Sequence, residues 1–363
     1  MNNTTDIDST KAKHWDIKTE KIEHSRLAEL DANNIQFGKT FADHMFVCEY
    51  DNGAWHNPVI IPYRELQLSP AISALHYGQA IFEGMKAYKN PAGEVRTFRP
   101  QKHIERLNKS ATRMAMPEFP KDLFLIALQQ LLTLDADWVP NKNIDDALYI
   151  RPLMFAADPF LGLRPSEKFL FCIFCSPASS YYAKPIKVLL SNQYVRAFPG
   201  GVGHAKAAGN YAATMLPLKE AQSKGFDQLL WMDGVEFKFA QEIGTMNIFF
   251  IIDDRVVTPV LDGTILDGVT RRSVIELLND RGYYVQERRV GMDEVINAYQ
   301  HGKLQDVFGT GTAATVAHIS DMMYGNDVIT LPPIEDRTLS FGIKKQLAEI
   351  KAGLAPDVHQ WMV

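Results

Sequence analysis

Helical and strand-like hydrophobic patterns alternate along the first half of the chain. Just after a proline, apolar side chains at Ile104, Leu107, Ala111 and Met114 lie three or four residues apart, which predicts one face of a helix. Residues 121–134 predict a second amphipathic helix. Short runs of apolar, β-branched and aromatic residues predict strands around these helices. The predicted strands cover 45–50, 59–62, 95–98, 147–155 and 169–175.

The second half shows the same mixture of patterns. It predicts strands at 186–190, 227–232, 235–239, 246–252 and 255–258. It predicts helices at 210–224, with a bend at Pro217, and at 268–281 and 292–301. The Ser-, Pro- and Tyr-rich stretch SPASSYYAKP, at 176–185, predicts a linker between the halves. We therefore expect α/β and α+β domains with a site between them, divided as 1–177, a linker at 178–185, and 186–363.

Composition and charge narrow the function. The 363 residues are 46% hydrophobic and 22% charged, which excludes disorder, collagen and coiled coil as the whole structure. The net charge of −5 argues against a general affinity for nucleic acid or anionic membranes. The apolar runs are far below the ~18 residues of a membrane helix. The start, MNNTTDIDSTKAKHWD, lacks the apolar region of a secretory signal. We expect a cytoplasmic protein that binds neither nucleic acid nor membranes.

Three cysteines are too few for a disulfide scaffold. Cys172 and Cys175 form a C-x-x-C pair inside an apolar run, so we interpret both as buried strand residues and expect no metal site. Cys48 stands alone in the sequence.

Lys206 is the first candidate for chemistry, in FPGGVGHAKAAGNY at 198–211. A phosphate-binding P-loop needs Gly before the lysine and Ser or Thr after it, whereas Ala205 and Ala207 occupy these places. The dinucleotide fingerprint G-x-G-x-x-G fails as well, because Lys206 stands at its last glycine. Two interpretations stay open: a Schiff-base lysine, or a surface lysine on a glycine-rich loop.

Further candidates are an acid and two segments suited to anions. Glu242, between two predicted strands, either faces a cavity or is a solvated turn residue. An acid facing a cavity could keep the ring nitrogen of pyridoxal phosphate protonated. DGVTRRSV, at 267–274, begins a helix whose free amides could bind phosphate. GTGTAATV, at 309–316, offers small residues and hydroxyls.

Two arginines also carry more than one interpretation. Arg106 lies off the apolar face of its predicted helix, as a solvated arginine would. Tyr149 and Arg151 are two apart on a predicted strand and so share a face, where they could hold a carboxylate or form an ordinary exposed pair.

Taken together, these motifs resemble the branched-chain amino acid aminotransferases, pyridoxal-phosphate enzymes of fold type IV. Eight motifs occur in the order of that family, between about residue 37 and residue 342. They are FGKTFADHM (37–45), LHYGQAIFEGMKAY (75–88), FRPQKHIERL (98–107), YIRP (149–152), GGVGHAKAAGNYAAT (200–214), EIGTMNIFF (242–250), LDGVTRRS (266–273) and GTGTAA (309–314).

The resemblance implies a role for each matching position. Lys206 would form the Schiff base with the cofactor, Tyr211 would hydrogen-bond the ring oxygen, and Glu242 would face the ring nitrogen. The phosphate positions would be Arg106, Val269, Thr270 and Thr312. The substrate pocket would be lined by Phe37, Phe82, Tyr149, Arg151, Tyr181, Thr245 and Ala313. Tyr77 would reach the neighbouring subunit's site in a homodimer.

The resemblance also implies the reaction, in which an amino group passes reversibly between L-leucine, L-isoleucine or L-valine and 2-oxoglutarate. It implies a smaller N-terminal α+β domain and a larger cofactor-binding domain, with the active site between them. One departure is TAATVAH at 312–318, which lacks the redox cysteines of mammalian members and so predicts no thiol regulation there.

Three other interpretations remain open. A D-amino acid aminotransferase and an aminodeoxychorismate lyase share the lysine and the glutamate, but resemble shorter chains that lack the FGKTFADHM extension. A regulator that binds the cofactor without turnover is the third interpretation, and the intact set of Lys206, Tyr211 and Glu242 argues against it.

Overall fold

The structure, a computed structural model, describes residues 15–182, 184–325 and 327–363. Most of the N-terminal stretch that we interpret as lacking a secretory signal, and position 183 of the predicted linker, lie outside the described residues. Within the described ranges, no helix combines the length and apolar character needed to cross a membrane. The same ranges contain no cluster of three or more His, Cys, Asp or Glu side chains that could hold a metal ion.

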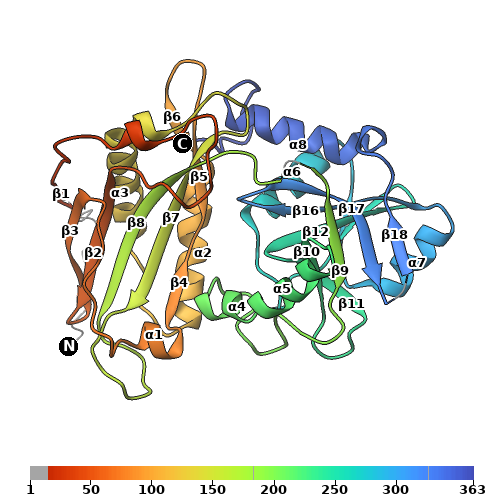
Figure 1. The fold of residues 1–363 in the computed structure, drawn as a ribbon, viewed down its shortest axis with the longest axis horizontal. Helices are drawn as coiled ribbons and strands as arrows, with labels where there is room; N and C mark the ends of the chain where they lie inside the picture. Colours follow the sequence, from red (N-terminus) through yellow and green to blue (C-terminus); the bar gives the residue numbers. More distant parts are fainter. Residues whose placement is uncertain (1–14, 183, 326) are drawn as a thin grey trace, which may run out of the picture.

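The first lobe is built on an eight-stranded sheet, in the order β1-β3-β2-β8-β7-β5-β6, with β4 beside β7 (Figure 1). The strands are β1 Lys18–Thr19, β2 His44–Asp51, β3 Ala54–Pro62, β4 Ala80–Phe82, β5 Met85–Lys89, β6 Val95–Thr97, β7 Ala147–Ala156 and β8 Phe169–Ala178. The helices are α1 Ser73–Tyr77, α2 Pro100–Arg113 and α3 Lys121–Leu134. Leucines and aromatics of α2 and α3 pack on the sheet in one core. As predicted, Cys172 and Cys175 are buried on β8.

The second lobe contains a ten-stranded sheet, in the order β14-β13-β12-β16-β17-β9-β10-β11-β15, with β18 beside β17. The strands are β9 Ile186–Leu190, β10 Gln228–Met232, β11 Phe239–Ile243, β12 Met246–Ile252, β13 Arg255–Thr258, β14 Val285–Glu287, β15 Val290–Gly291, β16 Leu304–Gly311, β17 Thr315–Tyr324 and β18 Asp327–Thr330. Because β11 also pairs with β12, part of the sheet closes on itself around an apolar core.

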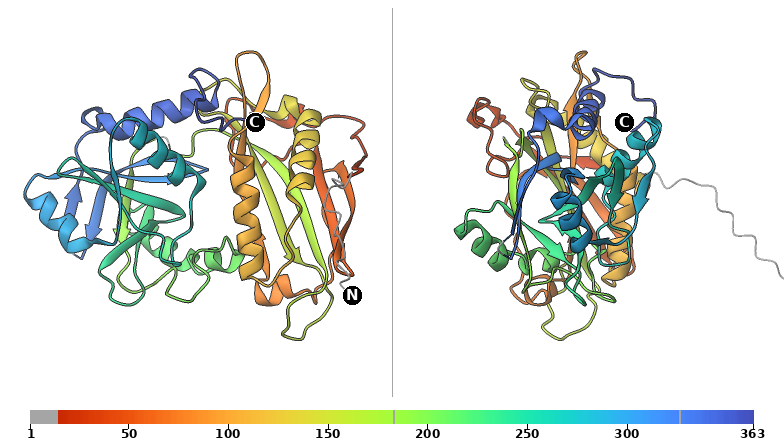
Figure 2. Two further views of the ribbon diagram at one scale, coloured as in Figure 1. Left: turned by 180° about the vertical axis from the view of Figure 1, so that it is seen from behind. Right: turned by 90° about the vertical axis from the view of Figure 1, so that its right-hand side faces the viewer.

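Five helices accompany this second sheet in the described residues (Figure 2). They are α4 Ala208–Ala212, α5 Met215–Ser223, α6 Val269–Asp280, α7 Met292–Gln300 and α8 Thr338–Lys351. Helices α6 and α8 share one apolar cluster with β12 and β16, whereas α7 packs against the core within the closed part of the sheet. The cluster around α6 and α8 also contains Tyr88, Phe98 and Ala147, so this side of the second sheet packs against the first lobe.

Two predicted elements are wrong in detail. The strand predicted at 235–239 is mostly a turn, because the Asp233 carboxylate accepts hydrogen bonds from the amides of Val235, Glu236, Lys238 and Phe239. Strand β11 begins only at the end of that turn.

The helix predicted at 210–224 is two helices, and Pro217 does not bend one continuous helix. Pro217 is the third residue of α5, a position in the first turn where the missing N–H would have no partner inside the helix. The break between α4 and α5 falls just before that turn.

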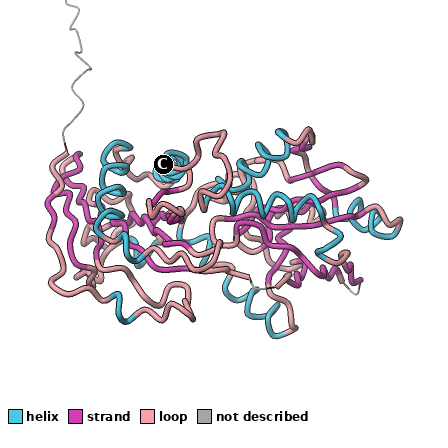
Figure 3. Tube along the Cα trace, turned by 90° about the horizontal axis from the view of Figure 1, so that it is seen from above, coloured by secondary structure: helices cyan, strands magenta, loops and turns pink. Residues whose placement is uncertain are grey.

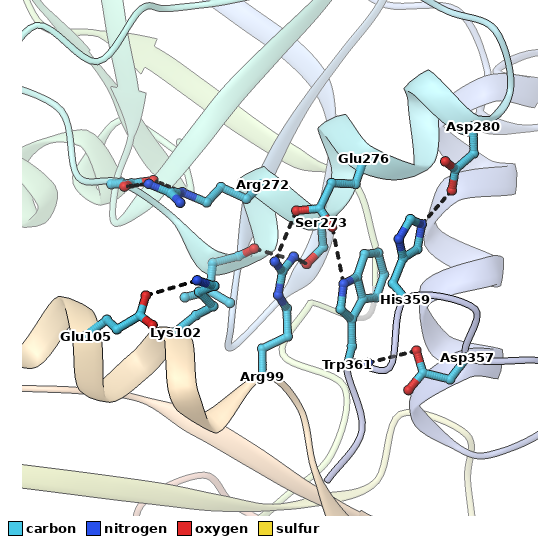
Figure 4. Close-up of polar contacts among 12 residues, drawn as sticks. Arg99, Lys102, Glu105, Arg272, Ser273, Glu276, Asp280, Asp357, His359 and Trp361 are labelled. Carbon is cyan, nitrogen blue, oxygen red and sulfur yellow. Dashed lines mark hydrogen bonds and ion pairs between the residues drawn. The ribbon is translucent and has the colours of Figure 1, made fainter. Parts of the chain in front are cut away.

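The lobes lie side by side (Figure 3) and touch far from the linker. Arg99, just before α2, donates to the Ser273 hydroxyl at 2.8 Å and to Glu276 at 3.0 Å, both on α6 (Figure 4). Its guanidinium also lies 5.0 Å from the ring centroid of Trp361. In addition, Val363 exchanges two backbone hydrogen bonds with the last residue of β6. The C-terminal residues thus tie α6 to the first lobe.

Candidate active site

A cavity of about 530 Å³ lies between the two lobes. Its walls come from β4, β7 and α2 on one side, and from β11, α6 and the β16–β17 turn on the other. It brings together every predicted site residue except Tyr77. These are Phe37, Phe82, Arg106, Tyr149, Arg151, Tyr181, Lys206, Tyr211, Glu242, Thr245, Val269, Thr270, Thr312 and Ala313.

Lys206 reaches into the cavity from the loop before α4. Its Nζ donates to the Tyr211 hydroxyl at 2.7 Å and lies 4.8 Å from the centroid of the Phe82 ring. The backbone is anchored to the first lobe, because the Lys206 amide donates to the Ser110 hydroxyl at 2.9 Å. Close packing also fixes the loop: a Cβ on Gly203 would lie 2.2 Å from a backbone oxygen of the second lobe. The lysine therefore presents its amine from a rigid support.

Glu242 lies on β11 at the opposite wall and is buried. One carboxylate oxygen is 2.6 Å from Arg196, and the other accepts from the Asn247 side chain at 3.0 Å. Burial raises the pKa of the Glu242 carboxyl, and the positive charges of Arg196 and Lys206 act in the opposite direction. Arg196 and Asn247 thus hold the Glu242 carboxylate in a fixed position at the edge of the cavity.

Sequence reasoning missed both partners of Glu242. Asn247 could have been found, because Glu242 and Asn247 pair across a hairpin with the two-residue turn Gly244-Thr245, and such a turn places these positions opposite each other. Arg196 comes from an irregular segment between β9 and α4, where no periodicity indicates its direction.

Two backbone segments offer donors to an anion. Val269 and Thr270 are the first residues of α6, which has no side-chain N-cap, so the amides of its first turn are free of intrahelical partners. A Cβ on Gly268 would lie 2.0 Å from the Asn247 side chain, so a larger residue would displace the side chain that holds Glu242. Nearby, the hydroxyl of Thr310 is buried and has no hydrogen-bond partner among the described residues. Thr310 lines the cavity and was not predicted.

Arg106 is buried rather than solvated. Its Nε and one terminal nitrogen donate to the Glu83 carboxylate at 2.7 and 2.8 Å, and its other terminal nitrogen donates to the Asp267 carbonyl at 2.9 Å. Glu83 also lies 2.7 Å from the His103 ring. The charge of Arg106 holds the pKa of the Glu83 carboxyl far below its usual range despite its burial. Three of the five N–H groups of Arg106 are thus used, and two remain for a ligand.

The wall formed by β7 carries aromatic rings and a cation. As the strand alternation predicted, Tyr149 and Arg151 share a face: Arg151 donates to the Tyr149 hydroxyl at 3.1 Å. The Arg151 guanidinium lies 4.7 Å from the Phe82 ring centroid, and its Nε is buried without a partner among the described residues. Phe37 packs edge-on against Tyr149 and Tyr181. This end of the cavity offers apolar surface beside one cation.

Tyr77 lies apart from this cavity, on α1. Its ring is about half exposed and its hydroxyl donates to the Leu161 carbonyl at 2.6 Å. Leu75, Leu161 and Leu163 are also exposed, at 66%, 60% and 83%. These exposed apolar residues lie on α1 and on the loop between β7 and β8, which the hydrogen bond between Tyr77 and Leu161 brings together.

Comparison with known proteins identifies the family to which this chain belongs. The sequence model described as "Amino-transferase class IV" matches residues 80–322. The chain is 43% identical to branched-chain-amino-acid aminotransferase 2 of Bacillus subtilis, over 91% of this chain and 92% of that protein. It is 38% identical to the branched-chain-amino-acid aminotransferase of Mycolicibacterium smegmatis, over 99% of both chains.

Solved structures agree with these sequence matches. The branched-chain amino acid aminotransferase of Escherichia coli superimposes with a TM-score of 0.72 at 25% identity, covering 88% of this chain and 98% of that one. The T.th. enzyme of the same name, solved in complex with N-(5'-phosphopyridoxyl)-L-glutamate, has a TM-score of 0.70 at 27% identity, covering 87% of this chain and 97% of that one.

The fold and the matches define a class IV aminotransferase of fold type IV, as the sequence predicted. Within that class, the chain belongs to the branched-chain amino acid aminotransferase family. The D-amino acid aminotransferase and lyase alternatives are not favoured by these relatives.

Proposed function

We propose that this chain transfers an amino group reversibly between L-leucine, L-isoleucine or L-valine and 2-oxoglutarate, with pyridoxal phosphate held on Lys206. One observation carries the proposal: the Lys206–Tyr211 pair and the buried Glu242, which Arg196 holds, face one cavity. The same cavity also combines apolar rings with the cation of Arg151. The names of the relatives support the same substrates.

The cavity residues fit pyridoxal phosphate. An amine and a phenol lie at one wall, a buried acid lies at another, and Thr310 lines the space with a buried hydroxyl that has no hydrogen-bond partner among the described residues. The free amides of α6, from Val269 and Thr270, suit the phosphate, together with Thr312 and the two unused N–H groups of Arg106. When bound, the cofactor supplies a ring that takes up the electron pair left when an amino acid loses its α-proton.

The chain's own groups then divide the work. Lys206 would hold the cofactor and, once released from it, would move the proton at the substrate α-carbon. Tyr211, within 2.7 Å of that amine, orients it by its hydrogen bond. Glu242, with its charge held by Arg196, keeps the ring nitrogen protonated.

The substrate end accommodates two kinds of side chain. Phe37, Phe82 and Tyr181 offer apolar surface to an aliphatic group, and Thr245 and Ala313 line the cavity on the second lobe. Arg151 is the cation for the second carboxylate of glutamate and 2-oxoglutarate, with Tyr149 beside it. Its side chain lines the cavity, so its guanidinium is placed to bind a carboxylate there.

Homodimer formation is part of the proposal. The exposed patch of Leu75, Tyr77, Leu161 and Leu163 is suited to cover by a second copy, which would bring Tyr77 to the neighbouring site. Replacing Leu163 by Asp should then lower the molar mass measured by light scattering toward that of a monomer. We likewise propose a cytoplasmic location and the domain boundaries 1–177, 178–185 and 186–363.

An absorption spectrum of the purified protein tests the function. With pyridoxal phosphate bound, a visible band should be lost on adding L-leucine and should return on adding 2-oxoglutarate. Lys206→Ala should bind cofactor without this exchange. A band that responds to D-alanine and ignores L-leucine would indicate the D-specific relative, and a band that ignores both would indicate the lyase or a regulator.

A further inference from the structure

Two lysines outside the cavity hold one of its walls. The turn at 312–314 joins β16 to β17 and lines the cavity. Behind it, Lys86 Nζ donates to the Ala313 carbonyl at 2.9 Å, and Lys351 Nζ donates to the Thr315 hydroxyl at 3.2 Å. Lys86 lies on β5 of the first lobe and Lys351 ends α8. Neither lines the cavity, so both act on the turn from behind.

The lysines are buried and lack acidic partners in contact. Lys86 is 5% exposed and Lys351 is 4% exposed. In the described ranges, neither forms an ion pair with a carboxylate. The Lys351 ammonium instead faces the Phe98 and Tyr88 rings, at 4.8 and 5.8 Å from their centroids. Both lysines are thus buried near each other, although burying a charged amine without an acidic partner costs free energy. This cost indicates that the two amines do more than fill space.

Titration of the two amines is coupled. Burial lowers the pKa of Lys86 to about 8. Burial and the neighbouring charge of Lys86 lower the pKa of Lys351 to about 7. Asp145, just before β7, acts in the opposite direction on both lysines. Burial and Asp145 raise the pKa of Tyr88 on β5, whose ring centroid lies 5.8 Å from the Lys351 amine, so Tyr88 stays neutral. The charge behind the turn thus changes near neutral pH.

The peptide group between Ala313 and Ala314 connects the buried lysines to the cavity. The C=O and N–H of a trans peptide point to opposite sides, and the described residues contain no cis peptide. When Lys86 fixes the Ala313 carbonyl behind the turn, the Ala314 amide must point the other way. Both alanines line the cavity. A charged donor on the carbonyl also polarises the same peptide and strengthens its N–H as a donor.

Strain in the turn makes such support necessary. Thr315 has a φ of 58°, in the left-handed region that a β-branched residue rarely adopts. Conformations of this kind persist only when their surroundings hold them. The hydrogen bond from Lys351 to the hydroxyl of Thr315 is one such restraint.

We propose that Lys86 and Lys351 are positioning residues that aim the amides of the 312–315 turn into the cavity, and that their positive charge strengthens the hold of the turn on the carboxylate of an amino acid or 2-oxo acid. This inference rests on the proposed function. It predicts that carboxylate affinity falls as the lysines lose protons.

The test is equilibrium binding of 4-methylvaleric acid, a branched carboxylate with no amino group to transfer, to the pyridoxal-phosphate form by calorimetry. Between pH 6.5 and 9.5, the affinity of the unchanged protein should fall about 10-fold, the order expected when one charge that acts across the turn is lost. Lys351→Met should bind about 10-fold more weakly at pH 6.5 and change less with pH. Lys351→Arg, charged throughout, should keep its affinity at pH 9.5. Lys345→Met, exposed on the same helix, is the control.

The free energy of unfolding in urea, measured at several pH values, tests whether Lys351 has a second, structural role. Folded Lys351 loses its proton near pH 7, whereas an unfolded lysine keeps it to about pH 10.5. The unfolded state therefore binds more protons in between, and the free energy of unfolding should rise with pH across that window. Lys351→Met lacks this titrating amine, so its free energy of unfolding should rise less across the same pH window, while its carboxylate binding at pH 6.5 is weaker.

The outcomes also separate this inference from the proposed function. If Lys351→Met binds 4-methylvaleric acid as the unchanged protein does at both pH values, with leucine transamination intact, the lysine inference fails alone. The same follows if Lys351→Arg loses affinity in parallel with the unchanged protein. If the unchanged protein binds no 4-methylvaleric acid at either pH, the proposed function fails and the inference fails with it.

Discussion

At the residue scale, the cavity works through charges whose partners are fixed by the protein. Glu242 is held between Arg196 and Asn247, and Arg106 is held by Glu83. Buried ion pairs of this kind add little net stability, but removing one partner is costly because the other charge is left uncompensated. Their value in this site is orientation, since each leaves a defined atom facing the cavity.

Glu242→Gln is expected to slow transamination of L-leucine by about 100-fold or more, because the fixed charge beside the cofactor ring is lost. Stopped-flow absorbance of the half-reaction measures the step directly. Glu236→Gln, an exposed acid near the same strand, serves as the control and should react normally. A near-normal rate for Glu242→Gln would contradict the role of the acid.

Arg151→Met is expected to discriminate between the two substrates. Loss of a hydrogen-bonding charge costs about 1.5–3 kcal/mol, or about 10- to 100-fold in affinity, for a ligand that uses it. The KM for 2-oxoglutarate should rise by that factor, while the half-reaction with L-leucine changes little. Equal losses with both substrates would show that Arg151 does not serve the second carboxylate.

At the element scale, Gly84, between β4 and β5, leaves the space that the Tyr149 side chain of β7 occupies. A Cβ at this position would lie 1.9 Å from the Tyr149 hydroxyl, which pairs with Arg151. Gly84→Ala should therefore destabilise the fold by about 1–3 kcal/mol, as overpacking does, and raise the KM for 2-oxoglutarate. Urea unfolding measures the first effect. Gly209→Ala, in α4 with open space around its Cβ, should be no less stable than the unchanged protein.

Hydrophobic periodicity predicted most of the helices and strands. The order of the motifs predicted most of the residues that line the cavity. Regular periodicity fixed α2, because its apolar face repeats over the whole helix. It failed at 235–239, where a side chain from outside the segment, Asp233, takes up the backbone amides. Arg196 was missed for the same reason, because its partner Glu242 is distant in sequence. Thr310 was missed because its place in the cavity wall appears only in the folded chain.

At the scale of the whole molecule, the network around Arg99 joins α2, α6 and the C-terminal residues (Figure 4). Arg99→Met should lower the free energy of unfolding by about 1–3 kcal/mol, because Ser273 and Glu276 lose a charged donor. Urea unfolding with saturating cofactor checks this. Arg96→Met removes an exposed pair with Glu94 and should change stability by about 0.5 kcal/mol or less. If the two variants lowered the free energy of unfolding equally, the contact between the lobes would add no more stability than an exposed ion pair.

The pairing of Val363 with β6 has a consequence during synthesis. Strand β6 is the edge of the first sheet, and residues 361–363 add backbone hydrogen bonds to that edge and the residues after it. The last main strand of this sheet ends at Ala178, so at about 5–20 residues per second the ribosome needs roughly 10–40 s more to reach residue 363. Throughout that interval the edge remains open to pairing with other nascent chains, because the residues that cover it are synthesised well after the sheet itself.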